Sequence, residues 1–156
     1  MTSEQVQAIV QKYVNEWNTE NPNYPMWIVL AGPGDPLNIP GATFPQNTAG
    51  MEQPINAHLI VLNKNMVAES ILTTFAHEYG HAVYRRGHTH NFNDVDSEVA
   101  AIRSSLTILP KEDLEPLAYR EAKAINEMAA KEPYKSAVQR LESDSLWRKY
   151  RPQPGE

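Results

Sequence analysis

Two histidines and a glutamate stand close together near the middle of the sequence, in the order His77-Glu78-x-x-His81. Residues four apart lie on one face of a helix, about one turn apart, so both imidazoles can reach one cation. Glu78 lies about 100° around the helix axis from His77 and about 60° from His81, close enough to reach a metal-bound water rather than the metal. Zinc-catalysed hydrolysis needs this arrangement of nitrogen ligands, an open coordination position and a nearby general base.

The helix that carries this motif is predicted from the apolar periodicity between Val67 and Tyr84. One broad face is apolar, and we expect it to pack into the core: Val67, Ile71, Leu72, Phe75, Ala76, Tyr79, Ala82 and Val83. The other side is polar: Ser70, Thr73, Thr74, His77, His81 and Tyr84. A solvated stripe usually carries Lys and Glu, and this one carries neither. We therefore predict a buried helix whose polar stripe faces a cleft; the alternative is a surface helix whose histidines have no function.

A third ligand is predicted on the following helix, which Asp94 or Asp96 is expected to cap and Pro110 to end. Its core face is formed by Val99, Ile102, Leu106 and Leu109. Glu98 falls at the edge of that face and should point inward. It would complete a His, His, Glu set with one open position, which is a catalytic zinc set. The alternative is an ordinary first-turn glutamate that stabilises the helix dipole.

Length and composition limit what the chain can be. Its 156 residues, 41% apolar and 21% charged, predict one soluble globular domain over residues 1–150, with a disordered tail at 151–156. The net charge of −5 argues against nucleic acid as a partner. Because there is no cysteine, metal ligands must be His and carboxylate. We find neither a membrane-spanning run nor a signal peptide, so the expected location is cytoplasmic and no membrane partner is expected.

The elements before the motif are predicted from periodicity and turn residues. An amphipathic helix begins near Ser3 as its cap, and two strands are expected at Met26–Ala31 and Ile55–Asn63. Between the strands, Gly32–Pro54 is a long irregular connection, either a flap over the site or a plain surface loop. The second strand could offer a free edge to a peptide, and Asn65 could cap the helix that follows.

The elements after the motif are two further helices, Lys111–Lys131 and Tyr134–Tyr150, which are expected to cover the core. The fold class is therefore α+β. We expect a small twisted sheet, antiparallel or mixed. An N-terminal helix, the HExxH helix, the glutamate helix and the C-terminal helices pack against it.

The motif His77-Glu78-x-x-His81, followed by Glu98-x-x-Ala101, resembles the gluzincin group of zinc peptidases. The element order is similar to that of the minigluzincins and the ImmA/IrrE-type peptidases, and the resemblance implies a zincin-like fold. Relatives usually carry Asn or Asp where Ile102 stands, so we expect the support of a ligand histidine to pass to Asp94 or Asp96. The metzincin pattern fails, because Gly87 stands where its third histidine would be.

The function predicted from these features is that of a zinc metalloendopeptidase acting on a peptide or protein substrate. Zn²⁺ would be held by His77, His81 and Glu98, and Glu78 would act as the general base toward a metal-activated water. Tyr84 is the first candidate donor to the oxyanion, followed by His88 and His90. Two alternatives remain open: an ImmA-like regulatory module that acts on one specific protein partner, and a catalytically inactive metal-binding protein. The oligomeric state is not predicted.

Overall fold

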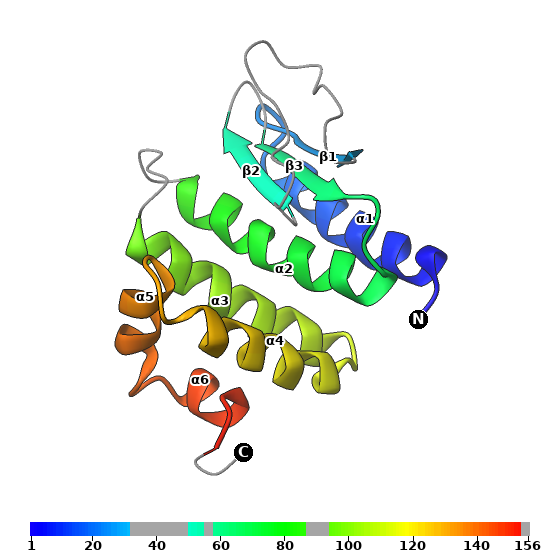
Figure 1. Ribbon diagram of the computed structural model, residues 1–156. Coiled ribbons are helices and arrows are strands. Elements are labelled where there is room, and N and C mark those ends of the chain that lie inside the picture. Colours follow the sequence, from blue (N-terminus) through cyan, green and yellow to red (C-terminus); the bar gives the residue numbers. More distant parts are fainter. Residues whose placement is uncertain (32–49, 55–57, 87–93, 154–156) are drawn as a thin grey trace. The chain divides into compact units, whose positions relative to one another are not determined.

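The computed structural model describes residues 1–31, 50–54, 58–86 and 94–153 of the chain. These residues form two compact units, Met1–Glu78 and Tyr79–Glu156. Helix α2 (Ala68–Arg85) belongs to both, because the boundary between the units falls within it (Figure 1). A single domain over residues 1–150 stays a prediction. Within the described ranges, no helix has both the length and the apolar character that crossing a membrane requires.

The first unit begins with helix α1 (Ser3–Glu20), which starts where the sequence provides a capping box. The hydroxyl of Thr2 accepts a hydrogen bond from Gln5 N at 3.1 Å, and the Gln5 side chain accepts one from Thr2 N at 2.7 Å. The cap is therefore Thr2, and the prediction of Ser3 was one residue late. The predicted apolar stripe is confirmed by four buried residues: Val6, Tyr13, Val14 and Trp17.

The sheet of the first unit has three strands, in the order β1-β3-β2: β1 (Met26–Ala31), β2 (Gly50–Pro54) and β3 (His58–Asn63). Strand β1 runs parallel to β3, with Met26 opposite His58, and β2 runs antiparallel to β3 (Figure 1). The sheet is thus mixed, and the fully antiparallel alternative is wrong. The first predicted strand has the observed bounds, whereas β2 was missed because it lies at the end of the segment assigned to an irregular connection.

Strand β3 is the central strand, so the prediction that it offers a free edge is wrong. It is paired with β1 on one side and with β2 on the other. Its core character explains this position, because Leu59, Ile60 and Leu62 are all buried. The start of the predicted strand at residues 55–57, and residues 32–49 of the predicted connection, lie outside the described residues.

Helix α2 has close to the predicted bounds, but its apolar face is narrower than expected. Leu72, Phe75, Ala76 and Ala82 are buried, whereas Val67 is 63% exposed and Val83 is 37% exposed. These two valines lie at or beyond the ends of the helix, where fewer neighbours cover it. The predicted cap Asn65 is wrong as well, since it lies in the turn that precedes the first helical residue, Ala68.

The described residues of the second unit form helices and the turns between them, and α3 (Val95–Lys111) lies at its centre. It contacts the three helices that follow: α4 (Glu115–Met128), α5 (Tyr134–Leu141) and α6 (Ser145–Tyr150) (Figure 1). Pro110 lies in the last turn of α3, so the predicted end is correct to within one residue. The predicted last helix is in fact two, because Asp144 accepts hydrogen bonds from Leu146 N and Trp147 N and thereby begins a new helix.

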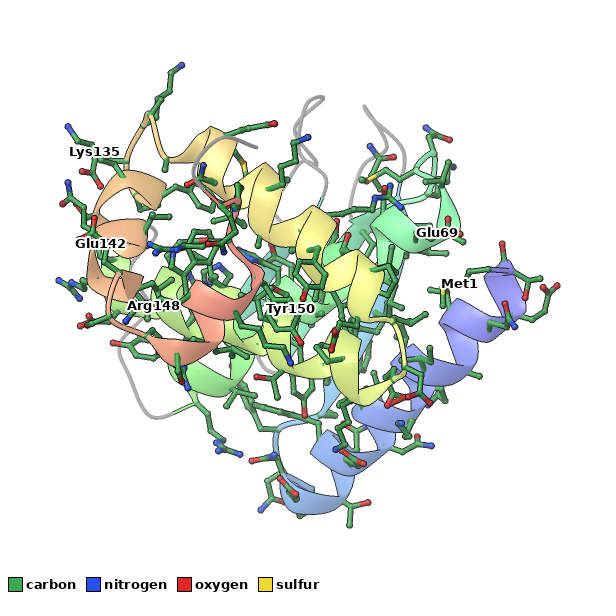
Figure 2. All side chains as sticks on the ribbon, turned by 90° about the horizontal axis from the view of Figure 1, so that it is seen from below. Met1, Glu69, Lys135, Glu142, Arg148 and Tyr150 are labelled. Carbon is green, nitrogen blue, oxygen red and sulfur yellow. The ribbon has the colours of Figure 1, made fainter. Side chains whose placement is uncertain are left out.

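Residues near both ends of the described chain make contacts within their own units (Figure 2 labels Met1, Glu69 and Tyr150). The amino group of Met1 lies 3.2 Å from Glu69 Oε1 at the start of α2. Tyr150 of α6 is buried, its hydroxyl donates to Glu115 Oε2 at 3.1 Å, and its ring meets that of Tyr119 edge-on. The C-terminal helix is therefore packed on α4 through both apolar and polar contacts.

Candidate metal centre

The three predicted ligands are buried and come together. His77 and His81 lie one turn apart on the continuous helix α2, so its backbone sets their spacing. Each histidine is 7% exposed, and Glu98 in the first turn of α3 is 6% exposed. One potential ligand atom of each residue lies within 4.8 Å of those of the other two. The inward orientation predicted for Glu98 is confirmed.

The distances and the donor atoms fit a zinc ion. In a tetrahedron with metal–ligand bonds of about 2.0–2.2 Å, neighbouring ligand atoms are separated by about 3.3–3.6 Å. The distance from His81 Nε2 to Glu98 Oε2 is 3.3 Å, which already equals one edge of such a tetrahedron. No two of the three potential ligand atoms are more than 4.8 Å apart. The most distant two would therefore need to approach by no more than about 1.5 Å to reach the tetrahedral separation of about 3.3 Å. Two imidazoles and one carboxylate also leave a fourth position open.

A cap on α3 places Glu98, the predicted third ligand. The Asp94 carboxylate accepts hydrogen bonds from Asp96 N at 2.9 Å and from Ser97 N at 3.4 Å. The backbone carbonyl of Asp94 accepts the bond from Glu98 N at 3.1 Å. The first turn of α3 is therefore held in a defined geometry, as the prediction of Asp94 as one of two candidate caps implied.

The side chain that supports His81 is Ser97, which the sequence analysis did not identify. Ser97 Oγ lies 2.7 Å from His81 Nδ1, and Ser97 is 1% exposed. The expected candidates for supporting a ligand histidine were Asp94 and Asp96. Asp94 instead caps α3, and the exposed Asp96 forms an ion pair with Arg140. The sequence signal that could have identified Ser97 is its small hydroxyl side chain directly before Glu98, in the first turn of the helix that follows the HExxH motif.

A second residue missed by the sequence analysis is Gly80, which lets α2 approach α3 closely. A Cβ at position 80 would lie 2.6 Å from Ala101 Cα, 2.6 Å from Ser104 Cβ and 2.9 Å from the Ala100 carbonyl oxygen. No side chain fits at these distances without a shift of the helices. Because Gly80 directly precedes His81, this contact sets how near His81 comes to the helix of Glu98.

Tyr84 follows His81 by one turn and faces the cap of α3. Burial raises the pKa of the Tyr84 phenol above its ordinary value of 10.0. The negative charge of Asp94 and a hydrogen bond to its carboxylate act in the same direction, and Arg140 opposes them. The phenol therefore meets Asp94 in this structure, and its role as an oxyanion donor stays a prediction. The other candidates, His88 and His90, lie outside the described residues.

Glu78, the predicted general base, lies between the two histidines on α2 and is half-buried. Its place in the helix follows directly from the motif, and partial exposure is compatible with access by a substrate and water. Its catalytic role stays a prediction.

Comparison with known proteins adds no family assignment. No protein-family model matches the sequence, and neither a curated protein nor a solved structure matches it.

Proposed function

We propose that this protein is a zinc-dependent peptidase of the gluzincin type, in which His77, His81 and Glu98 hold the metal. The observation that supports this proposal is the convergence of one donor atom from each residue to within 4.8 Å, with all three side chains buried. Binding of a metal is one of the ways in which buried charged and polar groups are compensated, and a single cation would engage all three side chains at once.

The chemistry is divided between the metal and the chain. Zinc held by His77, His81 and Glu98 would polarise a carbonyl and lower the pKa of a bound water. Glu78 accepts a proton from the attacking water and delivers it to the leaving nitrogen of the peptide bond. Tyr84 is the proposed donor to the negative charge that develops on the carbonyl oxygen. For this role the Tyr84 hydroxyl must release its hydrogen bond to the Asp94 carboxylate and donate to the substrate carbonyl oxygen instead.

The metal is tested first, by elemental analysis of protein purified without chelators. We expect one zinc per chain in the wild type, and strongly reduced zinc in His81→Ala and Glu98→Ala. Glu127→Ala, on an exposed position of α4, is the control and should retain full zinc. A wild-type protein that takes up no zinc, even after reconstitution, would contradict the proposal.

The reaction is tested next, with zinc-loaded protein and a library of fluorogenic peptides. Glu78→Gln keeps the size of the side chain but cannot act as a base. We expect it to retain zinc and to lose hydrolysis by about 10²–10⁴-fold, the usual contribution of a general base. Equal hydrolysis by the variant would exclude Glu78 as the base. A zinc-loaded wild type that cleaves no peptide would favour the two alternatives, a module specific for one protein partner or a metal-binding protein without activity.

A further inference from the structure

The hydrogen bond between Ser97 and His81 is buried and short, and it lies on the side of the imidazole opposite to Glu98. Ser97 Oγ is 2.7 Å from Nδ1, and Glu98 Oε2 is 3.3 Å from Nε2. We propose that Ser97 is a positioning residue of the metal centre, whose hydroxyl accepts a hydrogen bond from His81 Nδ1 and so keeps Nε2 unprotonated and directed at the metal. The inference rests on the zinc site proposed above.

The assignment of donor and acceptor follows from the chemistry of the two neighbours. A neutral imidazole carries one N–H, and the other nitrogen has a lone pair. An ionised carboxylate can only accept, whereas a hydroxyl can donate or accept. If Nε2 binds a cation together with Glu98, its lone pair must be free, and the ring proton must then reside on Nδ1. Ser97 is the group that receives this proton's hydrogen bond.

The backbone keeps the serine in place for this role. Ser97 lies in the first turn of α3, its N–H donates to the Asp94 carboxylate, and the next residue is the ligand Glu98. The same capped turn therefore carries a direct ligand and the support of a second ligand. Because Ser97 is only 1% exposed, water has little access to replace its hydroxyl. Loss of such a supporting bond typically costs about 10–100-fold in metal affinity.

The chain offers a matched control in Ser105, on the same helix. Ser105 is also buried, at 0% exposure, and its hydroxyl donates to the Ile102 carbonyl oxygen at 2.9 Å. Ser97→Ala and Ser105→Ala thus each remove one buried hydroxyl from α3 and change the side-chain volume equally. Only the first removes a hydrogen bond to a ligand.

The experiment measures the zinc dissociation constant of the full chain by competition with a chromophoric chelator. We expect Ser97→Ala to bind zinc about 10–100-fold more weakly than the wild type, and Ser105→Ala to bind it with wild-type affinity. Equal affinity of Ser97→Ala and wild type would overturn the inference while leaving the zinc site intact. A wild type that binds no zinc would overturn both, so the two failures are distinguishable.

A second measurement needs no variant, and it can overturn the inference even if Ser97→Ala fails to fold by circular dichroism. Long-range ¹H–¹⁵N correlation spectra of the zinc-loaded wild type report which ring nitrogen of His81 carries the proton. We expect the proton on Nδ1 and the metal on Nε2. A proton on Nε2, with the metal on Nδ1, would exclude Ser97 as the acceptor and overturn the inference.

Discussion

Replacing Gly80 by alanine tests how closely α2 and α3 must approach for the metal centre to form. The added Cβ would lie 2.6 Å from Ala101 Cα, whereas ordinary van der Waals contact begins at 3.4 Å. The shortfall is 3.4 − 2.6, or 0.8 Å. Two of the three obstructing atoms, Ala101 Cα and the Ala100 carbonyl oxygen, belong to the backbone, so a side-chain rotation cannot remove the clash. The helices must therefore separate by about this distance near His81.

The separation acts on the metal centre more strongly than on the fold. The His81 Nε2 to Glu98 Oε2 distance, now 3.3 Å, would grow to about 4 Å, beyond the edge of about 3.3–3.6 Å that tetrahedral zinc requires. Overpacking costs about 1–3 kcal/mol, and the higher helix propensity of alanine offsets about 1 kcal/mol of this. We expect a net loss of unfolding free energy of about 0–2 kcal/mol and a loss of zinc affinity of at least about tenfold, of the order seen when the surroundings of a ligand are disturbed.

Two assays on the same preparation separate these effects. Urea unfolding of the metal-free protein gives the change in stability, and chelator competition gives the zinc dissociation constant. Val83→Ala, at an exposed position of the same helix, is the control and should leave the affinity unchanged. Wild-type zinc affinity in Gly80→Ala, together with a gain of about 1 kcal/mol from helix propensity alone, would refute the argument that this contact sets the site.

Two further predictions concern the second unit. Asp94→Ala removes the cap of α3 and should lower the unfolding free energy, measured by urea unfolding, by about 1 kcal/mol. Asp94→Asn keeps a capping oxygen and should retain most of this stability. Equal losses of unfolding free energy in the two variants would contradict the capping role. Burial raises the pKa of the Tyr150 phenol above its ordinary value of 10.0. The folded state therefore keeps the phenol protonated to higher pH than the unfolded state does, and the stability that Tyr150 contributes is lost as the pH rises above 10. Tyr150→Phe should therefore be about 1 kcal/mol less stable than wild type at pH 8, and urea unfolding at pH 11 should show a smaller difference; a constant difference would refute this assignment.

The parts of the structure that follow from local pattern were predictable. The bounds of β1, the extent of α2 and the inward orientation of Glu98 each depend on residues within one element, where periodicity of 2 or 3.6 residues determines which side is buried. The grouping of the three ligands followed from the same source, because both histidines lie on one helix and Glu98 lies in the first turn of the next.

The parts that depend on partners distant in sequence were not predictable. The parallel pairing of β1 with β3 leaves no trace in either strand, since both are short apolar runs that suit several neighbours. The support of His81 by Ser97 and the close contact at Gly80 require knowledge of how α2 and α3 lie together. The division of the last helix was visible in principle at Asp144, but helical periodicity continues across it.

The parallel pairing in the first unit also has a consequence for the order of folding. Met26 lies opposite His58 in the β1–β3 register, so the first contacts between these strands close a loop of 58 − 26, or 32, residues. The entropy of such a closure costs about 3 kcal/mol before any sheet contact compensates it. In the second unit, α3 contacts α4, and α4 in turn contacts α5, so these three successive helices pack against one another. Local contacts form faster than distant ones, and we therefore expect the helices of the second unit to assemble before the sheet of the first.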